Sequence, residues 1–548
     1  MRRLLPVMAL VAAAAIAVAA NLSPLSAWWA TPPTPPTPPL PTRISQTWSF
    51  ASPRLAGGLP TRLAAVVGTE VILPSGPTPS LSGDLEAHDV ATGRTRFWRQ
   101  DFPLDDDLSV MAGSVLVQAG NRSGPGVVTG FGVGRDRNLW TRVLPVHANA
   151  LVVAGGKAVL TWGSTIQALL PDSGRTAWEK PLDCAPTGLE SWGRYAVLDE
   201  QCGVEPGYRR LVLDARDGTQ VLEERVGEWK TTALRGALGD LVVRESSGGL
   251  ELVGAGGVVR HRVPGSGLTV DQVIWRPEGG LVIVAAEDGR SLTAYDGTAK
   301  PLWRQPGVAG FDIDDEDSVV SPDHRFAYSL LNPNTDDVVT FLDVRSLADG
   351  RRAIFPLPVH RRGATILGVS GDSVVVRAVG ADGPAVTVHR LEGADREEKA
   401  VQVYGTRFDA WPDPCTLLPE NTLPGGGRPY DRRPAARFSA PHATCTLIPH
   451  DEHEHVVRIG VAWLSSTPSF ADRILAAVRA SDEQYGPLMR RPPDLGKGAY
   501  LRPDVNVHNQ RDQALVAAGG LVVVLRVEDD EQATMKYAKI LAARLRNE

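Results

Sequence analysis

The amino-acid sequence predicts a mainly β protein with a smaller α+β domain at its C-terminal end. Gly (55) and Pro (43) are abundant among the 548 residues, which is typical of short strands joined by turns. Hydrophobic residues make up 43% of the chain, enough for normal packed cores. A strand–turn–strand pattern recurs through the middle of the chain. The net charge of −6 gives no reason to expect a nucleic-acid partner, which would need a basic stripe.

Residues 1–30 have the pattern of an export or anchoring segment. Arg2 and Arg3 precede an uncharged stretch, rich in Ala, Leu and Val, over 4–30. Two interpretations compete. About 20 apolar residues can span a bilayer, so the segment stays as a single-pass anchor with the basic end in the cytoplasm. Alternatively, the small residues at 17–19 form a cleavage site and the protein is secreted. Both place the bulk of the chain outside the cytoplasm, at the cell membrane or beyond it.

The next segment, 31–43, is a Pro-rich spacer. Its core reads TPPTPPTPPLPT over 31–42. Such a segment adopts polyproline II, extended by about 3.1 Å per residue and stiff. We therefore expect it to hold a folded domain away from the membrane surface.

A repeat fills residues 44–405. Each copy has an alternating strand, a polar turn that ends in Gly, and a second strand that ends in Trp or Leu. The copies contain LEAHDVATGRTRFW (85–98), VTGFGVGRDRNLW (128–140), IQALLPDSGRTAW (166–178), LVLDARDGTQVL (211–222), ELVGAGGVVRHRV (251–263), LTAYDGTAKPLW (292–303), VTFLDVRSLADGRRAIF (339–355) and VTVHRLEGADREEKAV (386–401). Starts 38 to 47 residues apart predict a β-propeller with four short strands per blade. Eight copies predict eight blades, with a strand over 44–52 that closes the ring. The alternative is seven blades, because the copy that starts at 251 matches the repeat pattern poorly.

Four of these copies have a Trp residue at the same position, the end of the second strand. They are Trp98, Trp140, Trp178 and Trp303. A large flat indole can bury its face between adjacent blades while its N–H finds a partner at the rim. We therefore assign these residues to blade packing.

The first copy carries a family resemblance. Ala87, Asp89, Thr92, Gly93 and Trp98 fit, with one residue of slack, the pattern Ala-x-Asp-x-x-Thr-Gly-x-x-x-Trp. The stretch thus resembles the PQQ-like, or quinoprotein-like, propeller repeats, here of actinobacterial type, over about two-thirds of the chain. Dehydrogenases of that family hold a calcium ion, an Asp base and often an adjacent Cys–Cys pair at the axis. This chain has no Cys–Cys pair, so we expect no cofactor and no enzyme activity.

The four cysteines predict two disulfides. Cys184 and Cys202 are each nine residues from Gly193, so a hairpin turning there would place them opposite each other. Cys415 and Cys445 stand in matching contexts, CTLLP and CTLIP. An even count of cysteines outside the cytoplasm is typical of such bridges, and no CxxC spacing indicates a metal site.

The repeat stops before residues 406–548. This region has a strand pattern over 456–463, helical spacing from 469 to 478, apolar strands at 514–518 and 521–527, and a last helix over 535–545. It predicts a disulfide-bridged α+β domain. The Asp-Pro-Cys opening and the later Cys resemble small extracytoplasmic domains of uncharacterised actinobacterial lipoproteins, a resemblance that implies no activity. No lipobox Cys follows the N-terminal segment.

Candidate metal ligands lie in the run His450-Asp451-Glu452-His453-Glu454-His455. On a strand, His453 and His455 would share a face and could bind a transition metal; the alternative is a solvated polar turn. The acidic runs 312–317 and 105–107 are either calcium ligands or exposed loops, and they lack an EF-hand spacing. Neither G-x-S-x-G, nor a P-loop, nor H-E-x-x-H occurs, so no catalytic residue is assigned.

These patterns predict a non-catalytic binding or scaffold protein at the outer face of the cytoplasmic membrane. Its expected partner is a protein of the envelope or membrane, with the membrane itself contacted through the N-terminal helix. A PQQ-dependent dehydrogenase-like enzyme and an envelope polysaccharide-binding module are the alternatives. Fold alone does not decide among them.

Overall fold

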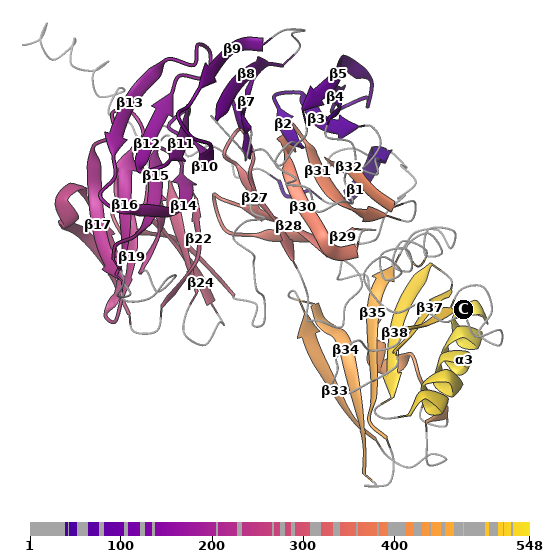
Figure 1. Ribbon diagram of the computed structural model, residues 1–548. Coiled ribbons are helices and arrows are strands. Elements are labelled where there is room, and N and C mark those ends of the chain that lie inside the picture. The colour runs from indigo at the N-terminus through magenta and orange to yellow at the C-terminus, as the bar shows by residue number, and fades with distance from the viewer. Residues whose placement is uncertain are drawn as a thin grey trace, which may run out of the picture. The chain divides into compact units, whose positions relative to one another are not determined.

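The structure is a computed structural model of the 548-residue chain (Figure 1). Residues 1–38 lie outside its described part, and so do the expected anchor and most of the spacer. The described residues are 39–41, 43–51, 64–75, 82–103, 108–120, 126–133, 138–203, 207–226, 233–265, 268–274, 280–285, 291–306, 319–331, 340–357, 360–380, 383–392, 412–419, 422–423, 430–437, 440–450, 455–464, 475, 499–502, 513–518, 520–527 and 530–547. Among them, no helix is both long and apolar enough to cross a membrane.

Most of the described chain forms eight antiparallel sheets of four strands each. In chain order the sheets are β2(Ala65–Val67), β3(Glu70–Ser75), β4(Ser82–Asp89), β5(Thr95–Pro103); β6(Leu108–Ala112), β7(Val115–Gly120), β8(Val127–Gly132), β9(Asn138–Val143); β10(Ala148–Ala154), β11(Lys157–Trp162), β12(Thr165–Leu169), β13(Thr176–Pro181); β14(Ala185–Trp192), β15(Tyr195–Gln201), β16(Tyr208–Asp214), β17(Gln220–Val226); β18(Leu234–Leu238), β19(Leu241–Ser246), β20(Gly249–Val253), β21(Val259–Pro264); β22(Thr269–Ile274), β23(Leu281–Ala285), β24(Ser291–Asp296), β25(Pro301–Pro306); β26(Val319–Val320), β27(Phe326–Leu331), β28(Thr340–Ser346), β29(Arg352–Leu357); and β30(His360–Ser370), β31(Ser373–Gly380), β32(Gly383–Glu392) with β1(Arg43–Ala51). This mainly β arrangement is consistent with the expected β-propeller.

The last of these sheets is completed by the first strand of the chain. β1 pairs antiparallel with β32, from Arg43 opposite Glu392 to Ala51 opposite Ala385. The closing strand expected over 44–52 is therefore confirmed. β1 thus covers the edge of β32 and gives this sheet four strands, as in the other seven.

Apolar cores lie between successive sheets. Trp178 and Ile166 of one sheet pack with Ala196 and Leu211 of the next, and similar clusters join the other neighbours. The last sheet packs on the first through Val388 and the strand β3. Inner strands such as β23 (LVIVA) supply these cores because they are continuous apolar runs, so that both of their faces are buried against neighbouring sheets.

The C-terminal region forms a six-stranded sheet and a helix. The strand order is β33(Tyr430–Arg437), β34(Ala440–Pro449), β35(Val457–Leu464), β38(Leu521–Val527), β37(Gln513–Ala518) and β36(Ala499–Arg502), and the helix is α3(Glu531–Asn547). The strands expected at 456–463, 514–518 and 521–527 and the last helix are confirmed. The helix expected over 469–478 lies outside the described residues, apart from Leu475, which is helical.

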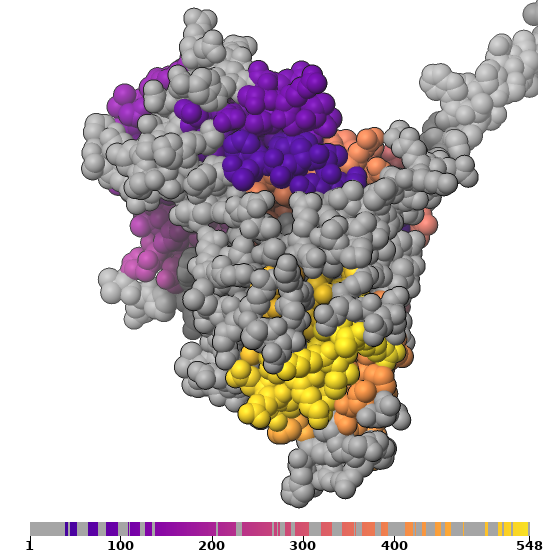
Figure 2. Space-filling view, turned by 90° about the vertical axis from the view of Figure 1, so that its right-hand side faces the viewer, coloured from indigo at the N-terminus to yellow at the C-terminus, as the bar shows by residue number. Residues whose placement is uncertain are grey.

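Helix α3 packs on one face of this sheet. Tyr537, Ala538 and Leu541 are buried against sheet residues such as Ile459 and Val523. The helix begins after Asp530, whose carboxylate accepts a hydrogen bond from the Ala533 backbone at 2.8 Å. The opposite side of α3 contributes to the yellow surface in Figure 2.

Candidate functional site

Contacts between Trp and Gly hold neighbouring sheets together. Trp178 donates its indole N–H to the Ala215 carbonyl at 2.8 Å, and its ring covers Gly218 of the following sheet. Three other indole N–H groups also donate to backbone carbonyls: Trp48 to Val90 at 2.7 Å, Trp140 to Pro171 at 2.5 Å and Trp303 to Leu347 at 3.3 Å. Their rings cover Gly93, Gly174 and Gly350, respectively. These four Trp residues thus pack between neighbouring sheets.

Glycine is needed at these contacts for two reasons. Gly218 has φ +75°, a conformation that residues with a side chain rarely adopt. A Cβ at this position would also lie 2.8 Å from the Trp178 ring, well inside van der Waals contact. The amide of Gly218 also donates to the Asp214 carbonyl at 2.8 Å and closes the turn.

Three of the four expected Trp residues, Trp140, Trp178 and Trp303, make this contact. The side chain of Trp98 lies outside the described residues, and only its pairing opposite Glu86 is described. Trp48, which the repeat pattern missed, makes the contact between β1 and the first sheet. At the sheet of β14 to β17, Leu222 takes the place of Trp and lies 3.6 Å from the Cβ position of Gly257.

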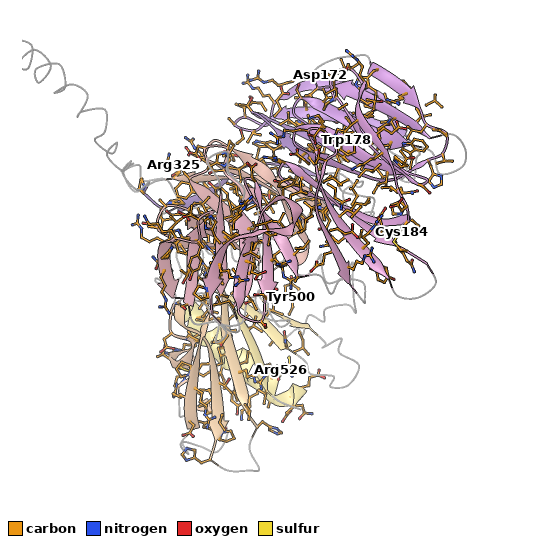
Figure 3. The ribbon with its side chains drawn as sticks, turned by 90° about the vertical axis from the view of Figure 1, so that its left-hand side faces the viewer. Asp172, Trp178, Cys184, Arg325, Tyr500 and Arg526 are labelled. Carbon is orange, nitrogen blue, oxygen red and sulfur yellow. A yellow bond between two sulfur atoms is a disulfide. The ribbon has the colours of Figure 1, made fainter. Side chains whose placement is uncertain are left out.

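The eight sheets have two unlike edges. At one edge, here called the turn edge, connections join the first to the second strand and the third to the fourth; they have two to six residues. At the other, here called the connection edge, segments join the second to the third strand and one sheet to the next; they have two to thirteen residues, from 163–164 to 52–64. Strands alternate in direction, so these two sets of segments lie at opposite ends of the strands. In Figure 3, Asp172 of the turn edge and Cys184 of the connection edge lie at opposite ends, with Trp178 between them.

Both expected disulfides are present. Cys184 and Cys202 have Cα atoms 4.9 Å apart, and the hairpin of β14 and β15 turns at Gly193 and Arg194, as expected. This disulfide therefore joins two segments of the connection edge, 182–184 and 202–207. The Cys415–Cys445 bridge, with Cα atoms 5.1 Å apart, ties the short 3-10 helix η6(Pro414–Thr416) to β34.

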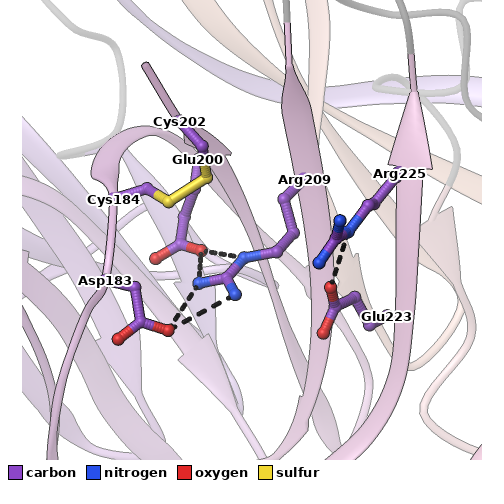
Figure 4. The surroundings of a disulfide bond; sticks show 7 residues. All are labelled: Asp183, Cys184, Glu200, Cys202, Arg209, Glu223 and Arg225. Carbon is purple, nitrogen blue, oxygen red and sulfur yellow. Dashed lines mark hydrogen bonds and ion pairs between the residues drawn. A yellow bond between two sulfur atoms is a disulfide. The ribbon is translucent and has the colours of Figure 1, made fainter.

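A charged cluster lies beside the Cys184–Cys202 disulfide (Figure 4). The side chain of Glu200 is fully buried, and its Oε2 receives the Arg209 guanidinium at 2.6 Å. Arg209 also reaches Asp183, whose side chain is 85% exposed, at 3.4 Å. Burial raises the pKa of Glu200, and the Arg209 hydrogen bond and charge offset only part of that effect. We call Asp183, Cys184, Glu200, Cys202 and Arg209 the disulfide cluster.

Sequence reasoning missed the charged members of this cluster. Glu200 lies near the end of β15 and Cys202 directly follows that strand, so their two-residue spacing places both side chains on one side of the chain. Arg209 lies opposite Glu200 only through the pairing of β15 with β16. That register depends on the six-residue connection between the strands, which the repeat pattern did not fix.

A second ion-pair network lies at the turn edge of the same sheet. Asp214 accepts hydrogen bonds from Arg194 at 2.5 Å and from Arg216 at 2.9 Å, and Arg194 also pairs with Asp240 of the following sheet. Burial favours protonation of Asp214, but the two guanidinium groups and the Arg216 backbone outweigh it and lower its pKa to about 2. This network spans two sheets and anchors the turn at Arg194.

The candidate metal ligands are not brought together in the described part of the chain. His453 lies outside it, as do the acidic runs 105–107 and 312–317. His455 lies 3.4 Å from Asp530, and His450 pairs with Asp431 at 2.9 Å. The His450 hydrogen bond lowers the pKa of Asp431. Within the described residues, the one group of metal-ligating type is Cys184, Glu200 and Cys202, and both of its sulfurs are in a disulfide.

No protein-family model and no curated protein matches this chain. Similar solved structures include BamB from Moraxella catarrhalis, 18% identical with a TM-score of 0.36, covering 64% of this chain and 100% of that one. A quinohemoprotein alcohol dehydrogenase from Pseudomonas putida is 10% identical with a TM-score of 0.35, covering 65% and 77%. A chain of the Mitotic Checkpoint Complex is 12% identical with a TM-score of 0.34, covering 66% and 95%. All three scores are below 0.5, so these likenesses carry no argument about function.

Proposed function

We propose that this protein is a non-catalytic binding platform, with an eight-bladed propeller whose connection edge contacts the partner. The observation that carries this proposal is the difference between the two edges of the sheets. Connections at the turn edge stay within two to six residues, whereas those at the connection edge range from two to thirteen. Loops of varied length on a rigid scaffold are the usual place for binding residues.

The scaffold beneath that edge has the rigidity that a platform needs. Trp–Gly contacts and apolar cores join successive sheets, and β1 completes the last sheet. The disulfide of Cys184 and Cys202 further ties two segments of the connection edge. Preorganised loops lose less conformational entropy on binding, which favours affinity.

The proposal includes a division of the chain. Residues 1–30 are the anchor or signal segment, 31–43 the spacer, 44–405 the PQQ-like propeller and 406–548 a separate α+β domain. The uncharged run after Arg3 and the two disulfides support a location outside the cytoplasm, because disulfides persist in oxidising compartments. The proposed partner is a protein of the envelope or membrane.

A titration distinguishes this function from the two alternatives. Purified protein is mixed with PQQ and calcium, and its absorption spectrum, thermal unfolding and dye-linked alcohol oxidation are measured; a parallel sample is sedimented with envelope polysaccharide. We expect no bound quinone, no turnover and no co-sedimentation. A stoichiometric quinone band with calcium-dependent turnover would establish a dehydrogenase, and saturable co-sedimentation would establish a polysaccharide-binding module.

A further inference from the structure

The two disulfides differ in their access to solvent. Cys415 is 7% exposed and Cys445 is 0% exposed, whereas Cys184 and Cys202 are half-buried. Asp183, next to Cys184, has an 85% exposed side chain. Reduction requires attack by a thiolate on a sulfur atom, so access limits its rate. A dissolved dithiol therefore reaches the Cys184–Cys202 bridge more readily than the other bridge.

A buried carboxylate with unused bonding capacity lies beside this bridge. The two sulfurs and a carboxylate oxygen of Glu200 all lie within 4.8 Å of one another. Oε2 of Glu200 accepts a hydrogen bond from the Arg209 guanidinium. Its Oε1 has no hydrogen-bond partner among the described residues. A buried carboxylate with one oxygen left unpartnered is costly, so the presence of the Glu200 side chain beside two sulfurs calls for an explanation.

We propose that the reduced form of this site binds a thiophilic divalent cation such as Zn²⁺. Its ligands are the thiolates of Cys184 and Cys202 and the carboxylate of Glu200, with a water as the fourth ligand. Two sulfurs and one carboxylate oxygen are ligands that zinc accepts in tetrahedral geometry. The 182–184 and 202–207 segments are then joined by a disulfide in the oxidised protein and by a metal in the reduced protein.

The backbone already places these ligands. β14 and β15 pair from Ala185 opposite Gln201 to Trp192 opposite Tyr195, directly beside the cysteines. These ladder hydrogen bonds do not depend on the S–S bond, so the hairpin keeps both sulfurs on neighbouring strands after reduction. The Cα separation of 4.9 Å leaves the side chains free to turn towards one cation.

The site changes state in two steps, reduction of the disulfide and then binding of the cation. A dithiol reductant supplies two electrons and two protons; the S–S bond breaks, two thiols form, and the reductant becomes a disulfide. Binding of the cation releases the two thiol protons to water as two metal–sulfur bonds form. The two thiolates and Glu200 carry three negative charges, which the divalent cation and the neighbouring Arg209 offset.

The test uses Co²⁺ as a spectroscopic probe on the full chain. The protein is treated with limited dithiothreitol under anaerobic conditions and desalted, and its free thiols are mapped by alkylation and mass spectrometry. We expect alkylation at Cys184 and Cys202 before Cys415 and Cys445. Co²⁺ should then give a thiolate-to-cobalt absorption band that one equivalent of Zn²⁺ removes, while the oxidised protein gives none.

Two matched variants assign the ligands. Glu200→Gln should weaken Co²⁺ binding at least about tenfold. Glu223→Gln, the same change on β17 of the same sheet, should leave it unchanged. The double variant Cys184→Ser, Cys202→Ser should lose the band. The proposal is overturned if the reduced protein gives no band, if Glu200→Gln binds as tightly as the unchanged chain, or if the band survives in the double serine variant.

Reduction removes the covalent link beside β14 and β15, so circular dichroism accompanies each titration to show that the sheet stays folded. A cation that binds only the folded form raises its unfolding temperature. We expect Zn²⁺ to raise the unfolding temperature of the reduced protein and leave that of the oxidised protein unchanged. Loss of the β signal that Zn²⁺ does not restore would also overturn the proposal.

Discussion

Trp48 covers Gly93 although the two residues belong to sheets at opposite ends of the repeat region. The indole ring lies where a Cβ of Gly93 would be 2.9 Å away, and its N–H donates to the neighbouring Val90 carbonyl at 2.7 Å. Trp48 belongs to β1, the first strand of the chain, which completes the last sheet through β32. Trp48 thus adds a hydrogen bond and a ring contact to the apolar cluster that joins the last sheet to the first.

Gly218→Ala should destabilise the protein more than Gly156→Ala. Both residues have positive φ, +75° and +72°, so both variants incur about 1 kcal/mol of backbone strain. The Cβ at Gly218 would also meet the Trp178 ring, whereas nothing lies within 4 Å of the Cβ position at Gly156. We expect an additional loss of about 1–3 kcal/mol for Gly218→Ala from overpacking. Equal losses in urea unfolding would mean that the ring moves aside freely.

Trp178→Phe should cost more stability than Trp162→Phe. The Trp178 N–H donates to the Ala215 carbonyl in a buried position, whereas the Trp162 N–H has no partner among the described residues. Removing a buried hydrogen bond and leaving the carbonyl unpaired costs about 1–3 kcal/mol. Denaturant unfolding of both variants measures the difference. A larger loss for Trp162→Phe would contradict the role given to the inter-sheet hydrogen bond.

Asp214→Asn should lower stability at neutral pH and lose most of that effect in acid. The folded-state pKa of about 2 is below the ordinary value of 3.8, so ionised Asp214 stabilises the fold at pH values above the unfolded-state pKa. That stability, about 2 kcal/mol, is lost as the pH falls from about 4 through 2. Unfolding of Asp214→Asn and the unchanged chain is compared from pH 7 to pH 2. A difference that stays constant over this range would show that Asp214 is not held ionised by Arg194 and Arg216.

Glu200→Gln should show the opposite trend with pH. Burial raises the folded-state pKa of Glu200 above 4.5, so the folded protein binds this proton more tightly than the unfolded chain does. The contribution of Glu200 to stability therefore declines as the pH rises through and above 4.5. We expect the stability of Glu200→Gln, relative to the unchanged chain, to increase over that interval. A relative decrease would indicate that pairing with Arg209 outweighs burial.

The sequence predicts those features that depend on local pattern. The repeat predicts the four-stranded sheets, and the symmetry about Gly193 predicts the Cys184–Cys202 pair, because both follow from strand alternation and turn position. Trp48 was missed because its role depends on β1 pairing with a strand more than 300 residues away. Glu200 and Arg209 were missed because they meet only through the register of β15 and β16.

The proposed binding edge can be tested directly by photo-crosslinking. A crosslinking amino acid replaces Asp183 at the connection edge or Asp172, also exposed, at the turn edge, in cells that produce the full chain. After irradiation, adducts are separated and identified by mass spectrometry. We expect one recurring protein adduct from position 183 and none from position 172. The same adduct from position 172 alone, or no adduct from position 183 and from further sites along the connection edge, would contradict it.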